Sequence, residues 1–155
     1  MGAVYYSQLC DIYSGKIKNW KDVGGKDQRI RVIRREDGDS SLAVLLKTLP
    51  GFKDITLTKK SKTTLSDPIT VEIAGKTAGA IAFGTYPNVI VNNNVHHLAL
   101  GKLKATDADY PCVGSLALIF KEKNKKGNLG KFIDFVSTKL AKEAITKAGA
   151  IPIAK

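Results

Sequence analysis

The chain is poor in several residue types and patterns, and each scarcity excludes a class of protein. Its 155 residues include only two cysteines, Cys10 and Cys112, which lie far apart and offer no metal-binding spacing. No apolar run approaches the roughly 20 residues that a membrane-spanning helix requires. The first residues, Met1 to Val4, show no signal-peptide pattern. We expect a globular chain without a membrane span, in which the cysteines are either paired or two buried free thiols.

The sequence also lacks the common motifs of enzymes and metal sites. It contains no Gly-x-Ser-x-Gly, no Walker-type phosphate loop and no Gly-x-Gly-x-x-Gly. Its two histidines, His96 and His97, are adjacent, so they diverge on a helix and point to opposite faces of a strand. The acidic residues between 36 and 39 lack the spacing of a calcium loop and stand beside arginines. We therefore expect no catalytic residue, no metal and no cofactor.

Positive charge is in clear excess, with 25 Lys and Arg against 14 Asp and Glu and a formal net charge of +11. Such an excess favours anionic partners, but a solvated lysine-rich surface explains it equally well. Aromatic residues make up 7% of the chain and do not alternate with Lys or Arg, as a surface that stacks single-stranded nucleic acid requires. We expect no nucleic-acid partner.

Hydrophobic periodicity predicts helices that alternate with strands. The predicted helices are 5–13, one that starts at 39–41 and runs to 49, 66–75, and a long one within 127–149. The predicted strands are 30–33, 55–58, 79–84, 89–91 and 116–120, the last being the longest apolar run and therefore a central strand. This alternation indicates an α/β fold with a mainly parallel sheet, in a single domain over residues 1–155.

One stretch, from Arg29 to Leu49, predicts a strand, a tight turn and the start of a helix. Asp37-Gly38 is a turn signal, and the three residues that follow are all good helix N-caps. A helix N-terminus presents unpaired N–H groups and partial positive charge, and a guanidinium binds an oxyanion through two parallel hydrogen bonds. The candidate ligand-binding residues are Arg35, Asp37, Gly38, Asp39, Ser40 and Ser41.

The same turn also has an interpretation that needs no ligand. Asp39 or Ser40 can act only as a helix cap, while Arg35 pairs with Asp37 across the turn. From these residues alone, both interpretations stay open.

Several stretches of the chain, taken together, resemble one known family. Residues 9–25 (LCDIYSGKIKNWKDVGG) are similar to the signature L-x-D-I-[FY]-S-G-K-I-x-N-W-x-[DE]-[VI]-G-G of phosphate-binding solute-binding proteins of ABC transporters. Residues 30–38 resemble the strand that follows in that family, and residues 79–84 resemble its G-A-I-G-Y strand. Tyr110-Pro111 and the segments 132–136 and 148–153 resemble its later Y-P, F-[IL]-x-[FW] and G-[YF]-x-P-[IL] patterns in the same order.

The resemblance implies one lobe of a type II periplasmic-binding-protein fold, in which two α/β lobes close on a ligand. This chain matches the second lobe and the C-terminal segment. The family captures phosphate, or a similar tetrahedral oxyanion, outside the cytoplasmic membrane for an ABC transporter permease. Its ligand loop, R-x-D-G-S-G-T, contacts the anion through side chains and N–H groups, and the matching positions here are Arg35, Asp37, Asp39, Ser40 and Ser41.

Two departures from that pattern bear on function. Asp39 and Ser40 replace the family's Ser-Gly, so a carboxylate would repel the anion and a side chain would limit its approach to the backbone. The chain also starts where the family's second lobe starts, so we expect weak anion binding without an N-terminal lobe. An alternative is a degenerate lobe that serves as a protein-interaction or sensory module without anion binding.

Overall fold

The computed structural model describes residues 2–153 and divides the chain into two compact units. The first unit extends to Gly114 and the second begins at Ser115, and each is described here by itself. A single domain over residues 1–155 stays a prediction.

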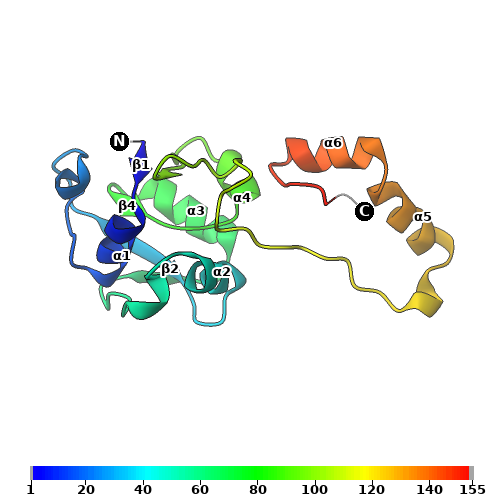
Figure 1. Cartoon of the computed structure of the whole chain (residues 1–155), viewed down its shortest axis with the longest axis horizontal. Helices are drawn as coiled ribbons and strands as arrows, with labels where there is room; N and C mark the ends of the chain where they lie inside the picture. Colours follow the sequence, from blue (N-terminus) through cyan, green and yellow to red (C-terminus); the bar gives the residue numbers. More distant parts are fainter. Residues whose placement is uncertain (1, 154–155) are drawn as a thin grey trace. The chain divides into compact units, whose positions relative to one another are not determined.

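The first unit contains the strands and most of the helices (Figure 1). Its strands are β1 (Ala3–Val4), β2 (Arg31–Arg35), β3 (Lys62–Thr64), β4 (Ala80–Ile81) and β5 (Ala99–Leu100). Its α-helices are α1 (Tyr6–Ser14), α2 (Ser40–Thr48), α3 (Asp67–Lys76) and α4 (Tyr86–Ile90), with short 3-10 turns at Trp20–Val23 and Phe52–Asp54. The helices and strands alternate, which confirms the predicted α/β class.

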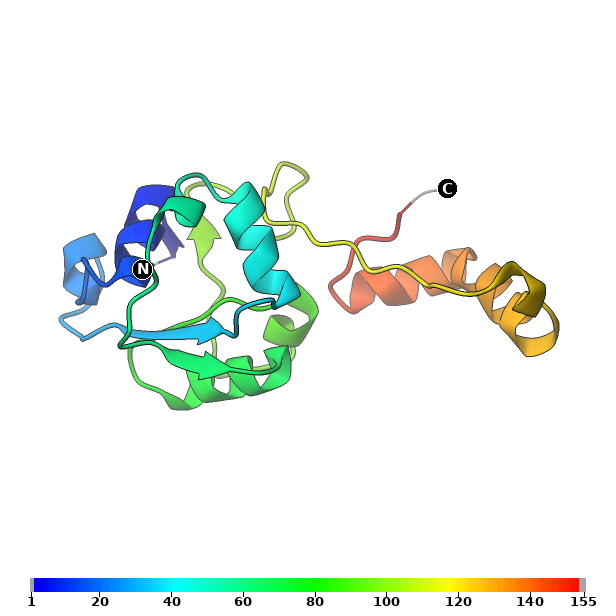
Figure 2. The ribbon, with the colours of Figure 1, turned by 90° about the horizontal axis from the view of Figure 1, so that it is seen from below.

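The strands form two small parallel sheets, and β2 is the central strand of the larger one. The sheet order is β3-β2-β4, with Arg35 opposite Thr64 and Arg31 opposite Ala80. The second sheet pairs β1 with β5. Figure 2 shows β2 and β3 side by side, with α1 and α2 on one side of them and α3 on the other. All pairs within these sheets are parallel, so the strands of each sheet end at the same edge.

The core of this unit lies between β2 and the first two helices. Tyr13 of α1 and Phe52 are fully buried, with ring centroids 5.5 Å apart in an edge-to-face arrangement. Further buried side chains come from β2 and α2, notably Val32, Leu42 and Leu45. Trp20 packs at the margin of this core and donates a hydrogen bond from Nε1 to the Gly79 carbonyl oxygen at 3.0 Å. This packing holds β2 against α1 and α2.

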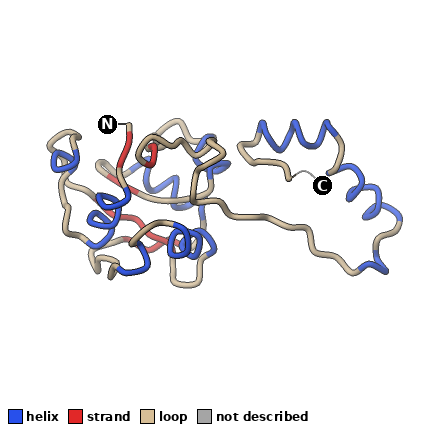
Figure 3. Tube along the Cα trace, in the orientation of Figure 1, coloured by secondary structure: helices blue, strands red, loops and turns tan. Residues whose placement is uncertain are grey.

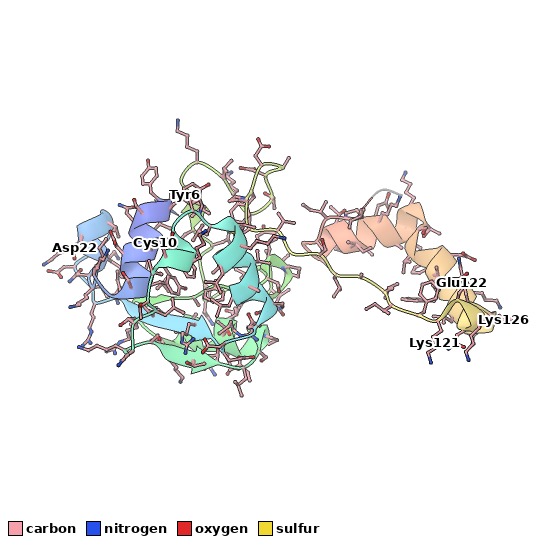
Figure 4. The ribbon with its side chains drawn as sticks, turned by 60° about the horizontal axis from the view of Figure 1, so that its bottom comes forward. Tyr6, Cys10, Asp22, Lys121, Glu122 and Lys126 are labelled. Carbon is pink, nitrogen blue, oxygen red and sulfur yellow. The ribbon has the colours of Figure 1, made fainter. Side chains whose placement is uncertain are left out.

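The second unit contains a 3-10 turn at Glu122–Asn124 and two helices, α5 (Gly127–Val136) and α6 (Lys139–Lys147). Figure 4 shows Lys121, Glu122 and Lys126 around the turn that precedes α5. Among its described residues, only Ile133 and Ala141 are classed as buried hydrophobic residues. So small a buried core contributes little hydrophobic stabilisation.

Two sequence predictions in the second unit are wrong. Residues 116–120, predicted as a central strand, form an extended loop, as the tube in Figure 3 shows, and Leu116 is 97% exposed. A strand needs a partner for its backbone groups, and this run has none within the described residues. The single helix predicted within 127–149 is divided in two, because Thr138 caps α6 by accepting a hydrogen bond from the Ala141 N–H at 3.3 Å.

Two predictions in the first unit are also wrong. Residues 89–91, predicted as a strand, belong mainly to α4, which starts at Tyr86 with Pro87 in its first turn. Residues 55–58 are not a strand, and the edge strand instead lies at Lys62–Thr64, where its backbone reaches the register of β2. The other predicted helices and strands appear with boundaries shifted by one or two residues, apart from 79–84, of which only Ala80–Ile81 is strand. No helix of residues 2–153 combines the length and apolarity needed to cross a bilayer.

Candidate oxyanion site

The predicted strand, turn and helix form as the sequence suggests. β2 ends at Arg35 and α2 begins at Ser40, with Asp39 as its N-cap. The Asp39 carboxylate accepts a hydrogen bond from the Leu42 N–H at 3.0 Å. Gly38 has a φ of 90°, which a residue with a Cβ rarely adopts, so glycine allows the chain to turn here. By their position, the N–H groups of Ser40 and Ser41 have no acceptor within the helix.

Arg35 is buried at this turn, and each nitrogen of its guanidinium contacts a protein oxygen. Its guanidinium Nη2 lies 2.8 Å from Oδ2 of Asp39, and its Nη1 donates to Oδ1 of Asp67. Its Nε donates to the Thr64 carbonyl oxygen at 3.3 Å. The exposed fraction of the side chain is 6% for Arg35, 8% for Asp39 and 10% for Asp67. The Arg35 guanidinium is therefore held between the carboxylates of Asp39 and Asp67, and all three groups are largely shielded from solvent.

The Arg35–Asp37 pair considered in the ligand-free interpretation does not form. Asp37 instead pairs with Arg34, whose Nη1 lies 2.7 Å from Oδ1 of Asp37, and the Asp37 side chain is 88% exposed. Successive strand residues point to opposite faces, so Arg34 and Arg35 reach different partners. Glu36 contributes a more distant carboxylate, with Oε1 3.7 Å from Arg35 Nη2. The structure thus brings Arg35 and Asp39 together and places Asp37 outside that cluster.

Asp67 belongs to this cluster, although sequence reasoning assigned it only to a helix start. It is the first residue of α3, and its second carboxylate oxygen accepts a hydrogen bond from the Thr85 N–H at 2.8 Å. One side chain therefore links the end of β2 to the start of α3 and the residue before α4. The signal that could have found it is the parallel pairing of β2 and β3, because the residues after both strands meet at one edge.

Below the arginine, two buried hydroxyl groups complete the hydrogen bonding. Thr64 Oγ1 and Thr70 Oγ1 lie 2.6 Å apart, so one hydroxyl donates to the other. The Arg34 carbonyl oxygen lies 3.1 Å from Thr64 Oγ1 and the Ser66 carbonyl oxygen 2.7 Å from Thr70 Oγ1, and the hydroxyl that accepts from its neighbour donates its own proton to the carbonyl oxygen beside it. These bonds join β3 to α3 at the residue whose carbonyl oxygen accepts the Arg35 Nε–H, so they hold that acceptor in place.

Negative charges outnumber positive charges at this turn, and this excess opposes the binding of an anion. Two arginines, Arg34 and Arg35, face the four carboxylates of Glu36, Asp37, Asp39 and Asp67. The Asp39 carboxylate occupies both a guanidinium edge and a helix N–H, which are the two kinds of donor an oxyanion would use. An external oxyanion must displace this side chain or bind to the remaining N–H groups of Ser40 and Ser41.

No arrangement typical of catalysis or of a metal site accompanies the turn. Among residues 2–153 there is no group of three or more His, Cys, Asp or Glu placed to hold a metal ion. His96 and His97 are both exposed, and the His97 ring contacts the Tyr86 ring edge-on at 5.6 Å between centroids. Neither histidine takes part in the ion pairs of Arg35 with Asp39 and Asp67.

In parallel α/β units ligands bind beyond the carboxyl ends of the strands, which is where this unit places Arg35 and the start of α2. A family model described as "PBP superfamily domain" matches residues 3–139. The chain belongs to this superfamily, that of the periplasmic binding proteins, and the resemblance to its phosphate-binding members is confirmed.

Two curated relatives carry the name phosphate-binding protein PstS. The protein of Bacillus subtilis (strain 168) is 27% identical over 154 residues, covering 94% of this chain and 49% of its own length. The protein of Borreliella burgdorferi is 26% identical over 164 residues, covering 94% of this chain and 56% of its own. The chain therefore spans about half the length of the curated relatives it matches.

Solved structures show the same fold. A candidate phosphate ABC transporter substrate-binding protein from Clostridium perfringens, crystallised with bound phosphate, superimposes with a TM-score of 0.83 at 23% identity, covering 99% of this chain and 64% of that one. PstS from Borrelia burgdorferi gives a TM-score of 0.70 at 20% identity and covers 100% and 65%. At these identities the structures establish the periplasmic-binding-protein fold, including its α/β class.

Proposed function

We propose that this chain is the oxyanion-binding lobe of a solute-binding protein, with phosphate or a similar tetrahedral anion as its ligand. The observation that carries the proposal is Arg35 beside the N-terminus of α2, at the edge where β2 and β3 end. Two curated relatives are named phosphate-binding proteins, and the Clostridium perfringens structure was solved with bound phosphate. The anion would be held by Arg35, Gly38, Ser40 and Ser41, with Asp37 and Asp39 as neighbouring acceptors.

The proposal includes partners and a location outside the cytoplasm. A second lobe would supply the other half of the ligand cleft, since the chain spans about half of its curated relatives. An ABC transporter permease would receive the solute, and the protein would work in the periplasm or another extracytoplasmic space. Binding and release need no covalent chemistry, so the lobe is non-catalytic. Without a second lobe, the affinity for the anion is weak.

A second candidate function is a degenerate lobe that acts as a protein-interaction or sensory module. The pair between Arg35 and Asp39 favours it, because this contact already satisfies the guanidinium edge that an anion would use. In this case the turn is a structural element and phosphate leaves it unchanged.

Backbone amide shifts in a phosphate titration test the proposal on the full chain. Phosphate should shift the amide signals of Gly38, Ser40 and Ser41 in a saturable way at millimolar concentration. Chloride at matched ionic strength is the control, because it reproduces salt screening without offering a tetrahedral oxyanion. Absence of specific shifts at millimolar phosphate would reject anion binding by this chain and favour the interaction module.

A further inference from the structure

A second polar feature lies at the opposite end of β2 from the oxyanion site. It is a groove of about 300 Å³, which we call the basic groove. Its walls come from the segment after α1, the start of β2, the segment before β3, and the C-terminal end of α3. Along β2, Arg31 is four residues and about 13 Å from Arg35, whereas Ile33, the lining residue of β2 nearest to that site, is two residues and about 7 Å from it. The amides of Arg31 and of Gly38 to Ser41 therefore report on the two features separately.

The groove combines an apolar floor with a strongly cationic rim. Its apolar lining includes Ile17, Ile30, Val32 and Ile73. Its rim carries five cationic side chains, all on exposed residues: Lys18, Arg29, Arg31, Lys60 and Lys62. None of the described lining residues is Asp or Glu. Within residues 2–153, none of the five cations takes part in an ion pair, whereas Arg34 and Arg35 on the same strand are both paired.

Helix ends do not account for so much positive charge in one place. The C-terminal ends of α1 and α3 adjoin the groove, through Gly15 and Thr77 respectively. Each helix end carries a partial charge of roughly −0.5, so together they offset about one of the five cations. The remaining charges repel each other, and a bound anion would relieve that repulsion.

We propose that the basic groove binds a small organic anion, one with a compact apolar body and a carboxylate, sulfonate or phosphate ester group. The apolar body would lie on the isoleucine and valine floor while the charged group meets the rim. A volume of about 300 Å³ is roughly twice that of a cavity that holds benzene, so it suits an apolar body of about ten carbon atoms. This proposal does not depend on phosphate binding at the turn after β2.

Three matched probes test it by amide chemical shifts on the full chain. Naphthalene-1-sulfonate has both the apolar body and the anion, 1-naphthol has essentially the body alone, and inorganic sulfate has the charge alone. Naphthalene-1-sulfonate should shift the amides of Ile30, Arg31 and Thr58 saturably. Its dissociation constant should be about 1 mM, the order expected for a ligand of this size in an open groove. The other two probes should bind at least tenfold more weakly.

Matched variants assign the charge contribution. Arg31→Gln with Lys62→Gln should weaken naphthalene-1-sulfonate at least tenfold. Lys102→Gln with Lys104→Gln removes the same charge at exposed positions outside the groove and should leave the binding unchanged. If the first double variant does not fold, Lys18→Gln with Lys60→Gln changes only residues outside the strands and serves the same purpose.

Several outcomes would overturn the proposal. Equal binding of sulfate would show a simple charged surface, and equal binding of 1-naphthol would show a merely apolar one. Equal losses in both double variants would show a general effect of net charge. Shifts confined to the amides of the second unit would place the probe elsewhere. The amides of Gly38, Ser40 and Ser41, read with phosphate, report separately on the proposed oxyanion site.

Discussion

The carboxylate of Asp39 lies 2.8 Å from the guanidinium of Arg35 and at the same time accepts the Leu42 N–H at 3.0 Å. One side chain of the protein thus makes the two contacts that an oxyanion would make at a helix start. The cap and the ion pair stabilise the turn, but they compete with any ligand for the same donors.

The double variant Asp39→Ser, Ser40→Gly should therefore bind phosphate more tightly than the natural chain. Removing the carboxylate frees Arg35 Nη2, and glycine at position 40 lets the anion approach the backbone. Isothermal titration or amide shifts with phosphate would measure a gain of at least tenfold. The single variant Ser40→Gly is the control, since it keeps the competing carboxylate. Unchanged binding in the double variant would show that Asp39 does not block the site.

Arg35→Ala should destabilise the first unit far more than Arg34→Ala. Arg35 is buried between Asp39 and Asp67, so its loss leaves two buried carboxylates without a cation, which costs about 3–5 kcal/mol. Arg34 pairs with the exposed Asp37, and such a pair contributes less than about 1 kcal/mol. Urea unfolding of both variants, followed by circular dichroism, gives the difference. Equal free energies of unfolding would contradict the structural importance of the Arg35 cluster.

The two cysteines should react slowly with a thiol reagent in the folded chain. The structure has both thiols free. Burial, followed by the nearby Asp11 and Asp54 carboxylates, raises the pKa of the Cys10 thiol, and burial likewise raises the pKa of the Cys112 thiol. Figure 4 labels Cys10 on α1. Since the thiolate is the reactive form, both should be sluggish at pH 8 and fast in urea.

Ellman's reagent, applied to Cys10→Ala and Cys112→Ala separately, would assign each rate. We expect the buried Cys10 to be the slower of the two, because Cys112 is only partly buried. Absence of any free thiol after unfolding would indicate instead that the two residues are paired.

Local sequence signals predicted the elements that position the site. The turn at Gly38, a helix N-cap within residues 39–41 and a helix start at Ser66 or Asp67 all depend on neighbouring residues, and the structure confirms all three. The strand predicted at residues 116–120 is wrong because a long apolar run indicates only a tendency toward burial in a strand. A strand also requires a pairing partner, which the composition of the run cannot supply.

The ion pairs at the site were the hardest feature to predict from the sequence. Arg34 and Arg35 are adjacent and chemically identical, and only the face of β2 on which each lies decides which one is buried. Asp67 lies 32 residues from Arg35, and its role follows from the register that sets Arg35 opposite Thr64. That register could not be derived once the neighbouring strand had been predicted at 55–58 instead of 62–64.

Tyr13 should make the stability of the first unit fall in alkaline solution. Full burial raises the pKa of its phenol well above the usual value of 10. Above pH 10 the unfolded chain loses this proton while the folded chain keeps it, so the free energy of unfolding decreases with rising pH. The loss attributable to this group is about 1.4 kcal/mol at pH 11 and is absent below pH 9.

Tyr13→Phe tests this assignment, because it removes the ionising group and keeps the ring that contacts Phe52. The lost hydroxyl donates only a long 3.4 Å hydrogen bond to the Ile33 carbonyl oxygen, so the variant should be slightly less stable at pH 8. Urea unfolding at pH 8 and pH 11 should show the wild type losing more stability than the variant by that amount. A difference between the two proteins that does not change with pH would contradict the prediction, since it would mean that the Tyr13 phenol ionises equally readily in the folded and unfolded chain.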